Sequence, residues 1–223
     1  MMLRAFLFDA GDVLYHRPHK NQFLDPFLHD LGLDANQVDK VAKRELQMRA
    51  WCGAIGYADY QTQLLKMFGV PDEHIARGLA TLEREEESVE FFDGVRETLH
   101  ELRARGFLLG VITDTATPER IKMQRFARGG FGDVWSVYVS SCAVGVRKPD
   151  SRMYNTALDA LNLRADESVF VGHKPRELIG ARAVGLKTAA FNYDANAPAD
   201  IYLEHFSELL NVPAILFPEN KSV

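Results

Sequence analysis

The sequence predicts an α/β protein with a doubly wound parallel sheet, covered by helices on both faces, and an all-helical block inserted after the first strand. Two observations support this prediction. From residue 93 onward, short apolar segments alternate with helical repeats, which is typical of βαβ units. Residues 16–92, by contrast, show helical spacing only.

The first element is an apolar run at residues 3–8, which ends at Asp9 and predicts a buried strand. Three helical repeats follow. Asp34 opens the first of them, and Gly69 ends the second. The apolar positions that define these repeats are Val38, Val41 and Leu46, then Leu64, Leu65 and Phe68, then Ile75, Leu79 and Leu82.

After this block the chain alternates between strands and helices. Further strands are expected at residues 107–112, 134–140, 168–171 and 188–191. Helices are expected around Val95, Leu99 and Leu102, from Pro118, around Met153, Ala157 and Leu161, at 177–184 and at 204–210. We therefore expect a core made of residues 1–15 and 93–223 and a helical insert at 16–92.

Composition excludes several classes of protein. A formal net charge of −5 gives no support for a nucleic-acid partner. No apolar run approaches the roughly 18 residues that a membrane-spanning helix needs. The N-terminal segment also lacks the features of a secretory signal. The two cysteines, Cys52 and Cys142, are far apart in the sequence, so reduced thiols and a cytoplasmic location are expected.

Polar residues follow the predicted strands where an open α/β sheet builds its sites. Asp9 comes directly after the first strand, where a carboxylate could act as a nucleophile or could only cap the turn. Thr113 has the same position after the second strand, and its hydroxyl could bind an anionic oxygen. Lys148 offers a positive charge to a bound anion or to Asp9.

Four segments stand at or near the predicted strand ends: FLFDAGDVL at 6–14, VITDT at 111–115, VRKPD at 146–150 and VFVGHKPRELIGA at 169–181. In this order they resemble the four motifs of the haloacid dehalogenase-like (HAD) hydrolases. The resemblance implies a Rossmann-like core with an inserted cap, a small-molecule substrate and, in the phosphatases, an aspartyl-phosphate on Asp9. Thr113 and Lys148 would stabilise the transferred group. Gly11, Asp12, Asp114 and His173 would bind phosphate or substrate.

The sequence departs from the family pattern at two positions. Two residues after Asp9, where the phosphatases carry an acid that protonates the leaving group, stands Gly11. The metal-binding Asp of the fourth motif is replaced by His173. By resemblance the Mg²⁺ ligands would be Asp9, Gly11, His173 and Glu177. Because Mg²⁺ prefers oxygen ligands, its binding is expected to be weakened or absent.

Two interpretations of His173 follow from this substitution. With Lys174, it could partly replace the positive charge of Mg²⁺ beside Asp9, or it could be an inert remnant of a lost metal site. Three functions therefore stay open: a phosphatase of small phosphate monoesters, a metal-independent hydrolase acting on carbon, and a binding protein without turnover. The helical insert offers polar or aromatic candidates to face the site, namely His16, His19, Arg44, Arg49, Trp51 and Tyr57.

Overall fold

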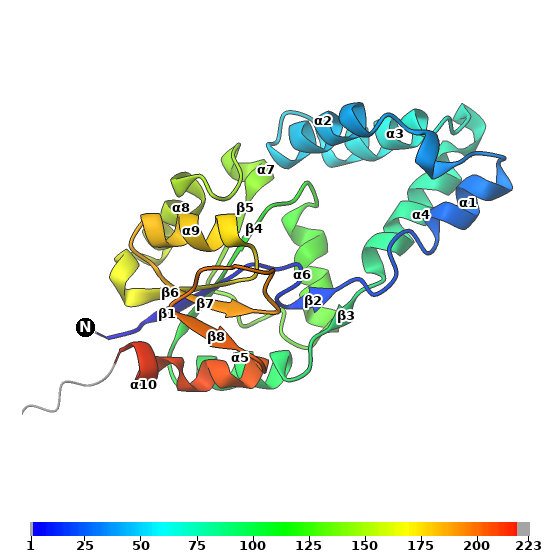
Figure 1. Cartoon of the computed structure of the whole chain (residues 1–223). Coiled ribbons are helices and arrows are strands. Elements are labelled where there is room, and N and C mark those ends of the chain that lie inside the picture. The colour runs from blue at the N-terminus through cyan, green and yellow to red at the C-terminus, as the bar shows by residue number, and fades with distance from the viewer. Residues whose placement is uncertain (1, 218–223) are drawn as a thin grey trace, which may run out of the picture.

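The computed structural model describes residues 2–217, and its centre is a six-stranded sheet with only parallel neighbours (Figure 1). The strand order is β5-β4-β1-β6-β7-β8. This confirms the predicted α/β class. The strands are β1 (Ala5–Phe8), β4 (Leu108–Thr113), β5 (Val137–Ser140), β6 (Ser168–Gly172), β7 (Lys187–Phe191) and β8 (Ile201–Leu203).

Helices cover both faces of this sheet, and β1 is buried on both sides. Phe6 and Phe8 point into one apolar core, while Ala5 and Leu7 point into the other. In Figure 1 the sheet lies between α8 and α9 on one side and α5 and α10 on the other. The helices of this part are α5 (Val95–Ala104), α6 (Glu119–Arg128), α7 (Ser141–Val144), α8 (Ser151–Leu161), α9 (Pro175–Ala183) and α10 (Val212–Leu216).

The inserted helices form a separate bundle that stands beside the sheet (Figure 1). They share a core of their own, which includes Phe27, Leu65 and Leu82. Two short antiparallel strands, β2 (Tyr15–His16) and β3 (Glu90–Phe91), connect the bundle to the rest of the chain. The bundle contains α1 (Leu24–Asp30), α2 (Lys40–Trp51), α3 (Tyr57–Met67) and α4 (Ile75–Glu87).

The first predicted repeat of the bundle begins later than expected. Asp34 caps only a 3₁₀ turn, Ala35–Gln37, and α2 starts at Lys40. The cap of α2 is Asp39, whose carboxylate accepts hydrogen bonds from the backbone N–H groups of Val41 and Ala42. Val41 is 68% exposed, so assigning it to the apolar face was wrong.

Short elements account for the other differences. The predicted strand at 134–140 begins only at Val137, and the expected helix at 204–210 is a 3₁₀ segment, Phe206–Asn211. Six elements were not predicted, namely α1, α7, α10, β2, β3 and β8. Of these, β3 lies inside residues 16–92, where only helices were expected. Periodicity is a weak indicator at these lengths. The short helical segments at Asp72–His74 and Ala165–Glu167 complete the fold. No helix within residues 2–217 has the length and apolar character to span a membrane.

Candidate active site

The carboxyl ends of β1, β4 and β6 bring three of the four motifs together. Phe8 of β1 is in register with Val111 of β4 and Val171 of β6. Asp9 therefore follows the central strand, and its N–H donates to Val171 O at 2.9 Å. Asp9 and Thr113 are both buried and line a cavity of about 490 Å³. Parallel sheets place ligand sites at this edge.

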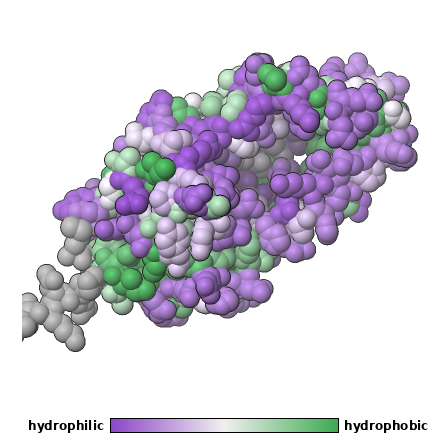
Figure 2. Space-filling view, in the orientation of Figure 1, coloured by the Kyte–Doolittle hydropathy of each residue, from purple (hydrophilic) through white to green (hydrophobic). Residues whose placement is uncertain are grey.

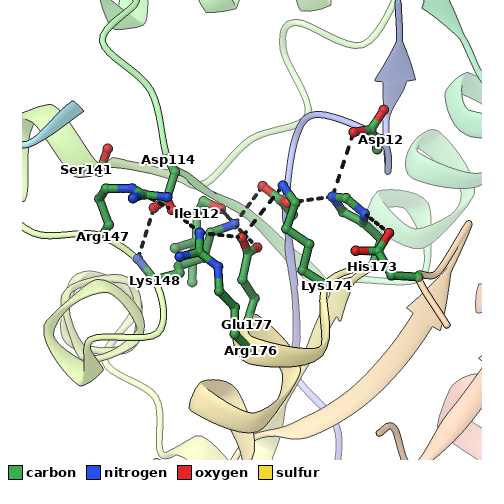
Figure 3. Close-up of polar contacts among 12 residues, drawn as sticks. Asp12, Ile112, Asp114, Ser141, Arg147, Lys148, His173, Lys174, Arg176 and Glu177 are labelled. Atoms are coloured by element: carbon green, nitrogen blue, oxygen red, sulfur yellow. Dashed lines mark hydrogen bonds and ion pairs between the residues drawn. The ribbon is translucent and has the colours of Figure 1, made fainter. Parts of the chain in front are cut away.

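Lys148 contacts residues of the first, second and fourth motif segments: the carboxylates of Asp9 and Glu177 and the backbone carbonyl of Ile112. Its Nζ lies 2.6 Å from Asp9 Oδ1 and 2.8 Å from Glu177 Oε2, and it donates to Ile112 O at 2.9 Å (Figure 3). Burial disfavours the ammonium, but Asp9 and Glu177 outweigh burial and raise the pKa of Lys148. The side chain is therefore a permanent buried cation beneath the cavity.

The pKa values of the two carboxylates that share this cation shift in opposite directions. Burial would raise the pKa of Glu177, but Lys148 lowers it to about 2. Burial raises the pKa of Asp9 above its ordinary value, although Lys148 opposes this shift. Asp9 Oδ1 also accepts the N–H of Ala10 at 2.8 Å. Its other oxygen, Oδ2, carries neither of these contacts.

His173 lies on the other side of Asp9 and is 3% exposed. Its Nδ1 is 3.4 Å from Asp194 Oδ1, and its Nε2 is 3.7 Å from Asp9 Oδ2 and 3.9 Å from Asp12 Oδ2. Figure 3 shows the His173 ring near Asp12 and well apart from Lys148. Among residues 2–217 the buried Nε2 has no hydrogen-bond partner, so one polar atom of the fourth motif is left facing Asp9 Oδ2.

The donor set beside Asp9 does not fit Mg²⁺ in the family manner. The fourth motif offers an imidazole, and Glu177 is occupied by Lys148 rather than directed at a cation site. Magnesium requires an octahedral set of oxygen ligands. Within residues 2–217, no three His, Cys, Asp or Glu side chains are grouped so that they could hold a metal ion.

Most of the residues predicted for the site line the cavity that contains Asp9. Gly11, Asp12, Asp114 and Glu177 line the same cavity as Asp9. Lys148 and His173 lie against Asp9 without being part of that lining. Among the candidates of the helical bundle, Arg44 and Trp51 line this cavity, His16 and Tyr57 line the adjoining one of about 450 Å³, and His19 and Arg49 line neither. In Figure 2 the surface is hollowed between the two parts of the molecule, with hydrophilic residues around the hollow.

Several charged residues of the site were missed by the sequence analysis. Arg147 and Arg176 line the cavity, although Arg147 is adjacent to the predicted Lys148. Lys122 of α6 also lines it and donates from Nζ to Tyr15 Oη at 2.7 Å. Only their proximity to motif residues could have indicated the two arginines. Lys122 carries no such indication, because its position depends on the packing of α6 against the strand at Tyr15.

Tyr15 closes one wall of the cavity with an unusual set of partners. Its hydroxyl oxygen accepts from Lys122 and from Arg125 Nη1, the latter at 3.0 Å. Burial would raise the pKa of Tyr15, but these two cations lower it below the ordinary value of tyrosine. Arg125 also holds Glu86, at the end of α4, at 2.8 Å. The inserted bundle is thereby bound to α6 through buried charge.

A family model for haloacid dehalogenase-like hydrolases matches residues 57–191 of the chain. The phosphoglycolate phosphatase of Yersinia pseudotuberculosis serotype I (strain IP32953) is 30% identical over 98% of this chain and 96% of that protein. A glyceraldehyde 3-phosphate phosphatase of Pyrococcus furiosus is 29% identical over 126 residues, which are 55% of this chain and 52% of that protein.

Solved structures of the same family share the fold. A 2-haloacid dehalogenase from Pseudomonas syringae pv. Tomato DC3000 superposes with a TM-score of 0.72 and 22% identity, covering 96% of this chain and 99% of that one. A HAD phosphatase from Thermococcus onnurineus superposes with a TM-score of 0.66 and 22% identity, covering 94% and 97%. Together with the family model and the full-length relative, this establishes that the chain belongs to the haloacid dehalogenase-like hydrolases.

Proposed function

We propose that this hydrolase cleaves small phosphate monoesters through an aspartyl-phosphate on Asp9. The observation that carries the proposal is the buried Asp9 carboxylate, held at 2.6 Å by Lys148 at the base of a cavity that Thr113 also lines. A carboxylate nucleophile fixed beside a permanent cation suits attack on an anionic phosphoryl group. The phosphoglycolate phosphatase that is similar over 98% of the chain supports the same reaction class.

In this mechanism Asp9 Oδ2 is the attacking atom, because Oδ1 is bound by Lys148 and by the N–H of Ala10. Oδ2 forms a bond to phosphorus while the ester P–O bond breaks, and the electron pair leaves with the alkoxide. Lys148 and the Thr113 hydroxyl stabilise the charge on the phosphoryl oxygens. Water then hydrolyses the aspartyl-phosphate and restores Asp9.

Proton transfer to the leaving group is expected to be inefficient in this site. Gly11 stands where the family phosphatases carry the acid, and glycine has no side-chain proton to give. Asp12 lines the cavity, but its backbone has φ of +60° and its side chain is 54% exposed. Loss of general acid catalysis costs about 10²–10⁴ in rate. We therefore expect slow turnover of alkyl esters and faster turnover of esters with good leaving groups.

We further propose that the reaction proceeds without Mg²⁺, which HAD phosphatases generally use. His173 takes the position of the metal-binding acid, and its Nε2, which has no hydrogen-bond partner among the described residues, is 3.7 Å from Asp9 Oδ2. Lys174 lines the same cavity, with Nζ 3.9 Å from Glu177 Oε1. These groups partly replace the positive charge of the metal. The competing interpretation, an inert remnant, predicts no loss when His173 is changed.

Residues 16–92 act in this proposal as a cap over a core of residues 1–15 and 93–223. Support comes from Arg44 and Trp51 of α2, which line the cavity that contains Asp9. A closed cap would exclude water from Asp9 and select the substrate. The cap would open and close at the β2–β3 pair, which links it to the core.

The test is hydrolysis of p-nitrophenyl phosphate by the wild type, by Asp9→Asn and by His173→Ala, each with Mg²⁺ and with chelator. Asp133→Asn, outside the cavity, is the matched control. We expect phosphate release that persists in chelator, vanishes in Asp9→Asn and falls in His173→Ala. Activity only with Mg²⁺ would refute metal independence alone. Turnover of a 2-haloacid with no phosphate release would refute the proposed reaction.

A further inference from the structure

The cavity over Asp9 holds more positive charge than its own acids neutralise. Asp9 and Glu177 are already bound to Lys148, which lies behind the lining. Lys148 offsets one of these two negative charges, so one of them remains, together with those of Asp12 and Asp114. The cations that line the cavity are Arg44, Lys122, Arg147, Lys174 and Arg176. A concave wall with this balance attracts anions.

Arg147 is one of these cations whose hydrogen-bond donors are only partly used. Its side chain is only 13% exposed. Its Nε lies 3.3 Å from Asp114 Oδ2, but it has no hydrogen-bond partner in the part of the chain that the structure describes. Arg176 approaches that same oxygen at 3.2 Å (Figure 3). The hydrogen bond of Arg147 Nη1 goes to Met48 Sδ at 2.8 Å, and a thioether is a weak acceptor. A half-buried guanidinium with these partners has donors left for a ligand.

Trp51 connects Arg147 of the core with Arg44 of the inserted bundle. The guanidinium of Arg147 lies 4.5 Å from the centre of a Trp51 ring, and that of Arg44 lies 5.9 Å away. Arg44 Nη1 is bound to neutral Gln47, at 2.9 Å, and not to an acid. Two like charges thus converge on one aromatic side chain, which aligns guanidinium groups by stacking.

A close backbone contact between Gly53 and Cys142 positions Arg44 and Trp51 beside Arg147. Gly53, two residues after Trp51, has a φ of +71°, and a Cβ at that position would lie 2.2 Å from Cys142 O. Only glycine allows the backbone after α2 to approach the core so closely. The bundle therefore rests on α7 at this point, and Arg44 and Trp51 are held beside Arg147.

We propose that Arg44, Trp51 and Arg147 form a second anion subsite, and that the substrate is a small phosphate monoester with a further anionic group on its leaving part. Arginine pairs bind carboxylates and phosphates through two parallel hydrogen bonds, so either group fits this chemistry. The proposal uses the proposed function to place the transferred phosphate at Asp9. The evidence for the subsite itself is the arrangement of the Arg44, Trp51 and Arg147 side chains.

Three compounds on one carbon skeleton test the subsite: 3-phosphoglycerate, glycerol 1,3-bisphosphate and glycerol 3-phosphate. The first two offer a carboxylate and a second phosphate, and the third offers a neutral hydroxyl at the same place. We expect kcat/KM to be at least about tenfold higher for one or both charged compounds, the effect of one charge-assisted hydrogen bond. Comparison of those two identifies the preferred anion.

The variants Arg44→Gln and Arg147→Gln are expected to reduce this preference about tenfold to a hundredfold. Their kcat/KM for glycerol 3-phosphate should change much less. Arg49→Gln is the matched control, because Arg49 belongs to the same helix but lines neither cavity. An unchanged preference in both cavity variants would overturn the proposal.

Binding of the same compounds to the Asp9→Asn protein, measured by titration calorimetry, separates the subsite from turnover. Tighter binding of the charged compounds, lost in Asp9→Asn with Arg147→Gln, would support the subsite even if no phosphate were released by the wild type. In that case only the proposed function would fail. Equal binding of all three compounds would overturn the subsite, whether or not the protein is a phosphatase.

Discussion

Lys148→Met should show how strongly the buried cation stabilises the fold. Lys148 is 1% exposed and forms ion pairs with two buried carboxylates, those of Asp9 and Glu177. Removing one partner of a buried ion pair costs about 3–5 kcal/mol, because the remaining charge stays desolvated. For a chain of this size that corresponds to a fall in melting temperature of about 6–20 °C. Activity should be lost together with stability.

The assay is urea unfolding followed by circular dichroism, with Lys187→Met as the control at an exposed strand position. In Lys148→Met with Glu177→Gln one of the two unpaired charges is gone. The double variant is therefore expected to recover part of the free energy of unfolding but none of the activity. If Lys148→Met unfolded within about 1 kcal/mol of the wild type, as for an exposed ion pair, the assignment of a buried shared cation would be refuted.

Three further predictions concern stability, and each is checked by thermal or urea unfolding. Because burial raises the pKa of Asp9, ionisation of this carboxyl opposes folding. Asp9→Asn should therefore raise the melting temperature at pH 7 and give no gain below pH 3.8. A melting temperature below that of the wild type at pH 7 would contradict this. Burial would raise the pKa of Glu86, but neighbouring cations including Arg125 lower it to about 2. Glu86→Gln should therefore lower the free energy of unfolding by about 3 kcal/mol at pH 7. This difference from the wild type should vanish as the pH falls from 4.5 towards 2. A difference that does not depend on pH would refute the ion pairing of Glu86. Gly110→Ala would place a Cβ 2.5 Å from Val137 Cγ1, so a loss of about 1–3 kcal/mol is expected, and a neutral outcome would contradict the packing.

The sequence was most informative where one short segment fixes both an element and a polar group. The apolar runs before Asp9 and within β4 and β6 were sufficient to predict the parallel sheet, since such strands are buried on both faces. The motif order also indicated that Asp9, Thr113 and Lys148 would share one end of that sheet. Their catalytic roles stay predictions.

The other features of the site depend on contacts between residues far apart in the sequence, and these could not be predicted. Nothing local to Lys122 shows that its ammonium meets Tyr15 across 107 positions of the chain. The stacking of Arg147 on Trp51 likewise depends on how α2 docks against the core. The start of α2 was misplaced because Asp34 and Asp39 are both good caps, and only packing decides which of them begins the longer helix.

Direct detection of an aspartyl-phosphate tests the central claim most directly. The wild type would be mixed with p-nitrophenyl phosphate in chelator, quenched and reduced with borohydride, which converts a phosphorylated aspartate into homoserine. Mass spectrometry of the peptide containing residue 9 would then locate the change. Homoserine in place of Asp9, only when substrate is present, is the predicted result. Phosphate release with Asp9 unmodified at every quench time would contradict the account.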